Sequence, residues 1–190
     1  MPRPQRVEAY AIVSADGMLA DASRHIPPAL QVEADQKFFH GALAQAALVV
    51  HGRHSHEGGP KADERHRLVL TRRVPALAPE PDYPHALRWN PAGASLQEAW
   101  AAVGAPDGLL AVIGGPEAYQ LFLDIGYDAF HLSRVPDFRL PGGRPVFPGI
   151  GPDLTPEDVL ASHGLHPARR QLLDAAAGVT LVSWERRQAN

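Results

Sequence analysis

Short apolar runs alternate with amphipathic segments along most of the chain. Four runs rich in Val, Ile, Leu and Ala have the length and composition of strands that are buried on both faces. They are Val7–Val13, Ala47–His51, Arg67–Thr71 and Leu109–Ile113. Apolar residues at helical spacing predict three helices between these strands. They are Gln31–Ala46, Ser95–Val103 and Glu117–Leu123. This alternation predicts an α/β fold with a central, largely parallel sheet and helices on both of its faces.

Two kinds of local signal set further boundaries. The segment Ser95-Leu96-Gln97-Glu98 has the pattern of a capping box, in which the serine covers a free amide and the glutamate reaches back. The Pro- and Gly-rich stretches Val74–Pro84 and Pro141–Pro152 predict loops, because neither can hold a long ladder of backbone hydrogen bonds.

The last part of the chain is predicted to be a helix followed by a strand. A cap at Thr155 indicates that a helix covers Thr155–Ala177, and Val179–Trp184 has the composition of a final strand. The length fits one domain over residues 1–190, with residues 155–190 as a C-terminal helix and edge-strand extension.

Composition is that of an ordinary soluble protein and excludes several kinds of chemistry. The 190 residues are 45% hydrophobic and 21% charged, with a formal net charge of -3, which favours neither a nucleic-acid nor a membrane partner. The absence of cysteine excludes disulfides, thiolate zinc sites, iron-sulfur clusters and a cysteine nucleophile. No long apolar stretch follows the N-terminal arginines, so we expect a cytoplasmic protein without a signal peptide.

The segment Val112–Tyr119, VIGGPEAY, suits a phosphate group. An apolar strand leads into Gly114-Gly115, and a helix starts at once. Glycines let the backbone approach a pyrophosphate closely, and the positive end of the next helix favours negative charge. The segment lacks the G-x-G-x-x-G spacing of a dinucleotide-binding Rossmann domain, and an ordinary strand-ending turn explains it equally well.

Two further strand ends carry polar groups that suit an anion. His51-Gly52-Arg53 and Leu70-Thr71-Arg72 each end a predicted strand. Three such strand ends can form one edge for an extended anionic ligand, since the arginine fork donates paired hydrogen bonds to phosphate. Each arginine taken singly is equally well explained as a solvated side chain at a strand end.

The order of these motifs resembles the dihydrofolate reductase superfamily from Val7 to about Gly149. The segments that carry the resemblance are VSADGMLAD, EADQKFF, VVHGRHSHE, LVLTRR, VIGGPEAYQLFL and VFPG. The resemblance implies a dihydrofolate-reductase-like three-layer fold and an NADPH cofactor. It assigns the cofactor to Gly52, Arg53, Ser55, Thr71, Arg72, Gly114, Gly115 and Tyr119. Arg53, Arg72 or Arg73 would then meet the adenosine 2'-phosphate.

The resemblance also assigns a catalytic role to Asp35, with Phe39 four residues later on the same helix face. A partly buried carboxyl group there would hold a ring nitrogen of the substrate and help to protonate the bond being reduced. An exposed helix carboxylate is the alternative, and Glu33 competes for the same role.

Two segments are more similar to the riboflavin-pathway reductases than to folate reductases. Ser14–Ala20 resembles their S-x-D-G-x-I-A segment, and Gly142–Gly149 resembles their G-G-x-P-x-F-P-G stretch, where Arg144-Pro145 replaces the Asp-Thr pair of folate reductases. Ser23–Ile26 stands in the place of a Ser-x-Trp-Ile segment but lacks the tryptophan. We expect no deaminase half like that of the bifunctional riboflavin enzyme in these 190 residues, because its zinc motif needs cysteines.

The sequence therefore predicts an NADPH-dependent reductase that transfers hydride to a pterin-like or aminopyrimidine small-molecule substrate. The residues expected on the substrate side are Ser14, Asp16, Arg24, His25 and Phe39. The alternatives are dihydrofolate reductase proper and a non-catalytic nucleotide-binding protein. Relatives of this kind are often homodimers. No metal is expected, since the histidines at 40, 51, 54, 56 and 66 lack the spacing of a metal site.

Overall fold

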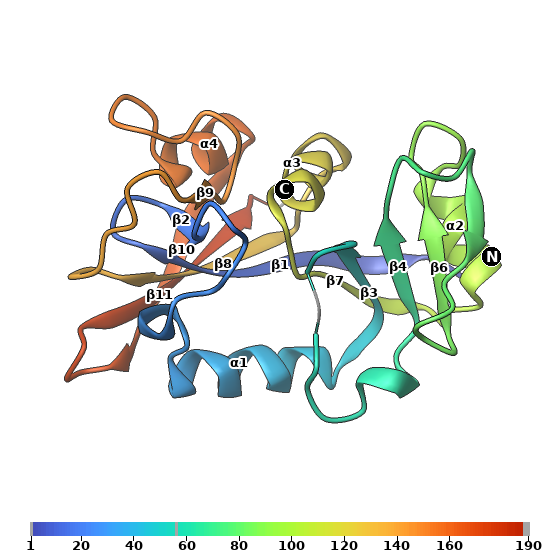
Figure 1. Ribbon diagram of the computed structural model, residues 1–190, viewed down its shortest axis with the longest axis horizontal. Helices are drawn as coiled ribbons and strands as arrows, with labels where there is room; N and C mark the ends of the chain where they lie inside the picture. Colours follow the sequence, from blue (N-terminus) through green and yellow to red (C-terminus); the bar gives the residue numbers. More distant parts are fainter. Residues whose placement is uncertain (1, 56, 188–190) are drawn as a thin grey trace.

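The fold is built on one large mixed sheet. The structure is a computed structural model that describes residues 2–55 and 57–187, and within these residues nine strands pair in the order β10-β11-β8-β1-β7-β3-β4-β6-β5 (Figure 1). The strands are β1 (Pro4–Ser14), β3 (Ala46–Gly52), β4 (Arg67–Leu70), β5 (Leu77–Pro79), β6 (Ala86–Trp89), β7 (Gly108–Val112), β8 (Ala129–Val135), β10 (Leu165–Asp174) and β11 (Val179–Arg186). A small second sheet pairs β2 (Met18–Ala20) with β9 (Arg144–Pro145).

The middle of the large sheet is parallel. Strands β8, β1, β7, β3, β4 and β6 pair with parallel neighbours, whereas β10, β11 and β5 are added in antiparallel fashion at the two sides. The predicted central, largely parallel sheet is confirmed. Because the carboxyl ends of parallel strands meet at one edge, the loops after β1, β3, β4 and β7 gather there.

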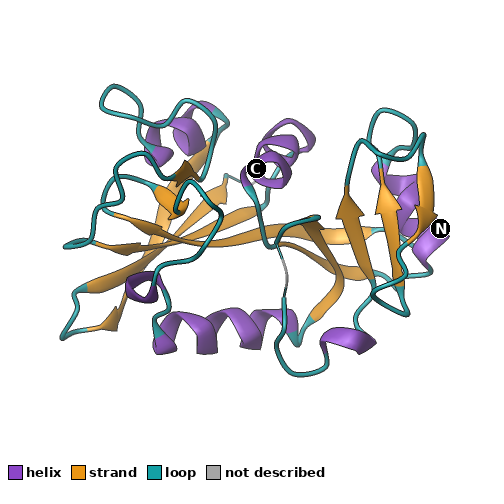
Figure 2. Ribbon diagram, viewed as in Figure 1, coloured by secondary structure: helices purple, strands orange, loops and turns teal. Residues whose placement is uncertain are grey.

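Helices cover both faces of the sheet, as predicted (Figure 2). The helix α1 (Glu33–Leu43) lies on one face, over a core that contains Tyr10, Val49 and Leu43. The opposite face carries α2 (Leu96–Val103), α3 (Pro116–Ile125) and α4 (Pro156–Ser162), whose side chains share the main core. Two short 3-10 turns, η1 (Pro28–Leu30) and η2 (Ala62–Glu64), lie in the connections.

The main core fixes the edge of the sheet where the loops gather. Trp100 of α2, Phe122 of α3 and Leu160 of α4 are fully buried and belong to the same apolar core as strand residues such as Leu48. The starts of α2 and α4 are set by local chemistry, since Ser95 and Thr155 form capping boxes. Among the described residues, none of the helices is long and apolar enough to span a bilayer.

The predicted helix over Thr155–Ala177 is wrong beyond its first two turns. Helix α4 ends at Ser162, and Gly164, with φ +81°, turns the chain into β10. The run of Arg, Gln, Leu and Ala favours a helix, but antiparallel pairing with β11 supplies its backbone hydrogen bonds as a strand. Its Pro167 is tolerated because β10 is an edge strand. The predicted strand Val179–Trp184 is confirmed as part of β11.

The two predicted loops each contain a short strand, which is a second correction. Val74–Pro84 includes β5, and Pro141–Pro152 includes β9. The sequence pattern predicts no strand at β6 or at β8, although β8 lies inside the sheet between β11 and β1. Its sequence AFHLSRV mixes buried polar residues with apolar ones and so lacks the purely apolar signature of β7.

Candidate active site

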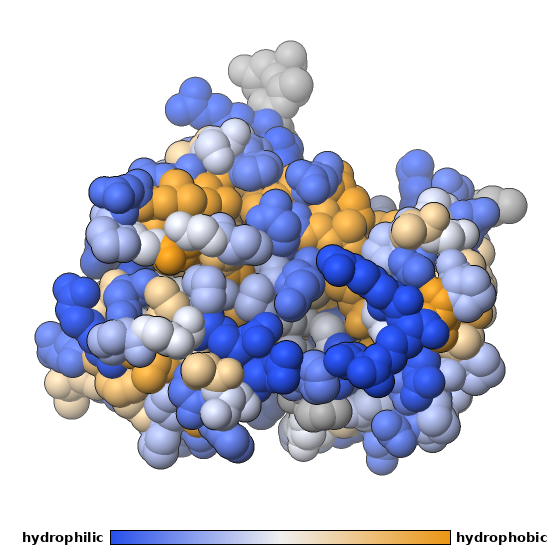
Figure 3. Space-filling view, turned by 45° about the horizontal axis from the view of Figure 1, so that its top comes forward, coloured by the Kyte–Doolittle hydropathy of each residue, from blue (hydrophilic) through white to orange (hydrophobic). Residues whose placement is uncertain are grey.

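A large cleft runs along the edge of the sheet where the parallel strands end. Its volume is about 1090 Å³, and its lining comes from β1, the loops after β3 and β4, the start of α3, and α1. Figure 3 shows strongly hydrophilic side chains gathered in the middle of this side of the molecule. The sequence-predicted residues that line the cleft are Arg24, Asp35, Phe39, Gly52, Arg53, Ser55, Thr71, Arg72, Gly114, Gly115 and Tyr119.

The two glycines after β7 meet the loop after β3 at close range. The amide of Gly52 donates a hydrogen bond of 2.7 Å to the main-chain oxygen of Gly114. A Cβ atom on Gly115 would lie 3.3 Å from Oγ of Ser55, and one on Gly114 would lie 3.5 Å from the same atom. Gly115 is also the N-cap of α3, and no side chain caps that helix end. The amides of the first turn are therefore available to a negatively charged group.

Exposed arginines mark one end of the cleft. Arg53, Arg72 and Arg73 all line it, and all three are exposed. Among the described residues, none of the three lies within ion-pair distance of a carboxylate. Guanidinium groups without an acidic partner keep their full attraction for phosphate, so this end of the cleft suits an anionic ligand.

Asp35 is the acidic residue of α1 that reaches the cleft. Burial raises the pKa of its carboxyl group, and the nearby Ser133 hydroxyl offsets part of that increase. Glu33 is different, because its side chain is 83% exposed and pairs with Lys37 at 2.9 Å. The geometry therefore separates the two candidates: Asp35 faces the cavity and Glu33 faces solvent.

Tyr119 and Phe39 form apolar walls of the cleft. The hydroxyl of Tyr119 donates a hydrogen bond of 2.5 Å to the main-chain oxygen of Tyr10, and burial together with the nearby Asp35 raises the pKa of this phenol. The Tyr119 phenol therefore stays protonated and donates its hydrogen bond to this main-chain oxygen. The bond holds α3 against β1. Phe39 packs edge-on against the Tyr10 ring, with 6.4 Å between the ring centroids.

Three residues predicted on the substrate side are not among the residues that line the cleft. The Ser14 hydroxyl donates to Oδ1 of Asp16 at 2.6 Å and accepts from the Met18 amide at 3.0 Å. Burial acts to raise the pKa of Asp16, but hydrogen bonds from Ser14 and the Leu140 amide outweigh it, so the pKa is lowered. These contacts fix the turn after β1. The third residue, His25, has a side chain that is 82% exposed.

Strand β8 contributes two cleft residues that the sequence prediction missed. Ser133 is 1% exposed, and its Oγ lies near the Asp35 carboxyl group. His131 stacks on Tyr10 at 5.0 Å, and its ring nitrogens lie 2.8 Å from Oγ of Ser183 and 3.1 Å from Glu8. The alternation of these polar residues with apolar ones along β8 is the signal that could have identified them.

Glu8 and Arg144 complete the charged surroundings. Burial would raise the pKa of Glu8, but hydrogen bonds from His131, Tyr10 and Arg6 lower it to about 2. Arg144 of β9 lines the cleft and lies 3.6 Å from Glu117 of α3, which lines it too. Among the described residues, no group of three or more His, Asp or Glu side chains is placed to hold a metal ion. His56 lies outside the described residues.

Comparison with solved structures identifies the fold. A protein described as a riboflavin biosynthesis protein from Shewanella sp. PV-4 superposes with a TM-score of 0.64 at 17% identity, covering 97% of this chain and 100% of that chain. The diaminohydroxyphosphoribosylaminopyrimidine deaminase/5-amino-6-(5-phosphoribosylamino)uracil reductase from Thermotoga maritima superposes with a TM-score of 0.60 at 15% identity. The match covers 97% of this chain and 57% of that longer one.

The chain has the dihydrofolate-reductase-like fold. The fold class predicted from the order of motifs is thus confirmed. No protein-family model matches the chain, and no curated protein matches it. At 15% and 17% identity, the two structures establish the fold alone, so the function has to be argued from the cleft.

Proposed function

We propose that this protein is an NADPH-dependent reductase of a pterin-like or aminopyrimidine substrate. The observation that carries the proposal is the joining of three features in one cleft: the exposed arginines, the close-packed glycines and the partly buried acid Asp35. A volume of about 1090 Å³ is at the upper end of the range for ligand sites and leaves room for a dinucleotide together with a small ring.

The cofactor end fits NADPH on the chemistry of its residues. Gly114, Gly115 and Gly52 leave space that a Cβ would narrow against Ser55 or the facing backbone, which suits close approach by a pyrophosphate. Arg53 and Arg72 are exposed and pair with no carboxylate in residues 2–55 and 57–187, and they would take the additional 2'-phosphate that distinguishes NADPH from NADH.

NADPH, when bound, supplies the hydride. The protein's own residues supply orientation, shielding and a proton. Asp35 would hold the substrate ring through its carboxyl oxygens, and its raised pKa favours the protonated form that can donate to the bond being reduced. Ser133, which is buried beside Asp35 and also lines the cleft, would offer its hydroxyl to the same ligand. Phe39 and Ile12 would exclude water from the reacting atoms.

The riboflavin-type aminopyrimidine is favoured over folate by the substrate end of the cleft. Arg24 and Arg144 both line the cleft, and the phosphate of a phosphorylated substrate would bind between them, with Arg144 also 3.6 Å from Glu117. The reductase activity in the name of the Thermotoga maritima neighbour acts on such a phosphorylated compound.

The test is NADPH oxidation with a panel of acceptors: a ribosylaminopyrimidine phosphate, dihydrofolate, other pterins and simple carbonyl compounds. We expect turnover with the aminopyrimidine or a pterin. Efficient turnover of dihydrofolate alone would make the protein a dihydrofolate reductase. Dinucleotide binding without oxidation on any acceptor would instead indicate a nucleotide-binding protein that does no hydride transfer.

A further inference from the structure

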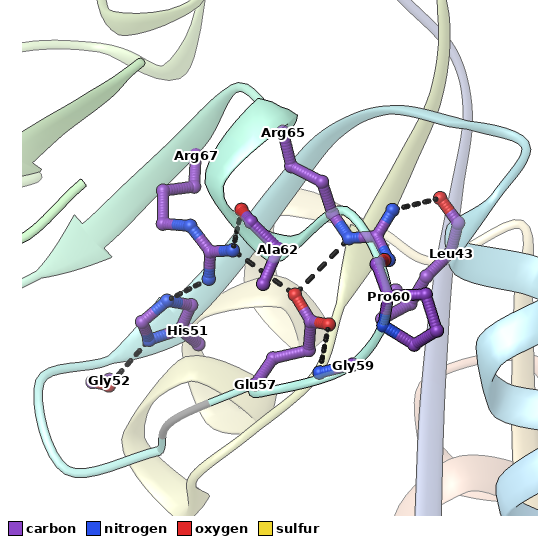
Figure 4. Close-up of polar contacts among 9 residues, drawn as sticks. All are labelled: Leu43, His51, Gly52, Glu57, Gly59, Pro60, Ala62, Arg65 and Arg67. Atoms are coloured by element: carbon purple, nitrogen blue, oxygen red, sulfur yellow. Dashed lines mark hydrogen bonds and ion pairs between the residues drawn. The ribbon is translucent and has the colours of Figure 1, made fainter. Parts of the chain in front are cut away.

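A buried polar cluster lies beneath the loop that follows β3 (Figure 4). The side chain of Glu57 is 1% exposed, that of Arg67 is 0% exposed and that of Arg65 is 10% exposed. Oε2 of Glu57 accepts from Nε of Arg65 at 3.2 Å and from Nη2 of Arg67 at 3.1 Å, while Oε1 accepts from the Gly59 amide at 2.9 Å. A buried carboxylate with three donors is held firmly in place.

This cluster takes the place of a helix in the connection between β3 and β4. Within the described residues, the only regular element between these parallel strands is the 3-10 turn η2. Nη2 of Arg67 also donates to the Ala62 oxygen at 2.8 Å, and its guanidinium lies 4.0 Å from the centre of the Tyr83 ring. The path of the connection is thus fixed by one carboxylate and two guanidinium groups instead of by an apolar helix face.

The cluster continues through His51 to the backbone of the cleft. Nη1 of Arg67 lies 2.9 Å from Nε2 of His51, and Nδ1 of His51 lies 2.8 Å from the main-chain oxygen of Gly52. An arginine side chain only donates hydrogen bonds, so Nε2 of His51 accepts and Nδ1 carries the proton. The ion pair therefore selects the tautomer of His51 that donates to Gly52.

Gly52 connects this chain of hydrogen bonds to the predicted cofactor edge. Its oxygen also accepts from the Ser55 amide at 3.0 Å, and its own amide donates to the Gly114 oxygen at 2.7 Å. The turn at Gly52–Ser55 and the Gly114-Gly115 peptide, which both line the cleft, are thereby held together.

We propose that Glu57, Arg67 and His51 are positioning residues that fix the Gly52–Ser55 turn for dinucleotide binding. The inference rests on the proposed function. It adds that affinity for the part common to NADPH and NADH depends on a buried ion pair, acting through a single tautomer of His51. We call the hydrogen bonds that run from Glu57 through Arg67 and His51 to Gly52 the relay. Loss of the relay should weaken the binding of both cofactors equally, whereas loss of an arginine at the 2'-phosphate should weaken NADPH binding alone.

Two substitutions at His51 test separately its hydrogen bond to Arg67 and its hydrogen bond to Gly52. In His51→Asn the amide can still donate to the Gly52 oxygen, near the position of Nδ1, but cannot reach Arg67. In His51→Gln the longer amide can reach Arg67 but has no donor beside the Gly52 oxygen. Since one hydrogen bond in a polar site corresponds to about a tenfold change in affinity, we expect His51→Gln to weaken NADPH and NADH about tenfold each. We expect a smaller loss for His51→Asn.

Glu57→Gln is compared with the control variant Glu157→Gln. Glu157 also pairs with an arginine, Arg134 of β8, but neither of these two residues lines the cleft. Dissociation constants for NADPH and NADH should be measured well below the melting temperature of every variant, so that global stability does not enter. Glu57→Gln should weaken the binding of both dinucleotides, and Glu157→Gln should leave both affinities unchanged.

Nitrogen-15 NMR of the histidine rings gives a readout that does not depend on binding. The wild-type His51 signal, assigned by its loss in His51→Asn, should show the proton on Nδ1, and this preference should disappear in Arg67→Met. The inference is overturned if the proton lies on Nε2, if His51→Gln binds both dinucleotides like the wild type, or if only NADPH binding suffers. A wild type that binds neither dinucleotide refutes the proposed function itself, and this inference with it.

Discussion

Replacing Asp35 by Asn tests the proposed acid, and Glu33→Gln on the same helix is its control. The Asp35 carboxyl group is partly buried on the cleft side of α1, whereas Glu33 is exposed and paired with Lys37. Positioned acids contribute about 10²- to 10⁴-fold to the rate of proton transfer. We therefore expect Asp35→Asn to lower kcat by about that factor, and Glu33→Gln to leave kcat unchanged.

Asp35→Asn should also change the stability of the protein, in a direction that the pKa of Asp35 determines. The folded-state pKa of Asp35 is raised above the unfolded value, so the folded protein binds the proton more tightly. The contribution of Asp35 to stability is fully present below the unfolded pKa and is lost as the pH rises through the folded pKa. The total loss is about 1.36 kcal/mol for each pH unit by which the folded pKa exceeds the unfolded one. Asparagine removes this cost. Asp35→Asn should be more stable than the wild type at neutral pH, and this advantage should vanish in acid.

Two assays read these effects together. Steady-state NADPH oxidation gives kcat, and denaturant unfolding at several pH values gives the free energy of unfolding. Asp35 is not the acid if Asp35→Asn turns over at the wild-type rate, or if Glu33→Gln is the variant that loses activity. A neutral-pH destabilisation by Asp35→Asn would contradict the raised pKa.

Three further predictions concern the cofactor edge and the core. Arg72→Gln should weaken NADPH binding by about 1.5 to 3 kcal/mol and leave NADH binding unchanged, as measured by titration. Equal losses of affinity for the two dinucleotides would contradict a role of Arg72 at the 2'-phosphate. Gly115→Ala would place a Cβ 3.3 Å from Oγ of Ser55, so dinucleotide affinity should fall while the protein stays folded; unchanged affinity would place the pyrophosphate elsewhere. Phe122→Ala should cost about 3 to 5 kcal/mol of unfolding free energy in guanidinium, because the ring is fully buried; a loss below about 1 kcal/mol would show that the core relaxes around the gap.

The central strands of the sheet could be predicted from the sequence because they are almost entirely apolar. Runs such as Leu109–Ile113 are buried on both faces, so nearly every position is apolar. The same rule fails for β8, where His131 and Ser133 face the cleft and interrupt the apolar run. It fails again for β10, an edge strand with mostly exposed side chains, where local helix preference is overridden by pairing with β11.

The cleft was predicted in part for a related reason. Residues that end parallel strands, such as Thr71 and Gly114, reach one edge because topology brings them there. Ser14 ends β1 and Asp16 follows it, but the Ser14 hydroxyl donates to Asp16, which also accepts from the Leu140 amide, and no local pattern indicates these contacts. The pairing of Glu57 with Arg67 likewise depends on the path of an irregular loop, so it could be found only in the structure.

The central claim is that the cleft binds NADPH in preference to NADH. The most direct measurement is thermal stability during titration with each dinucleotide, since a ligand at a hundred times its dissociation constant adds about 2.7 kcal/mol to the folded state. We expect NADPH to stabilise the protein at concentrations where NADH has little effect. Absence of stabilisation by either dinucleotide would contradict NADPH binding in the cleft.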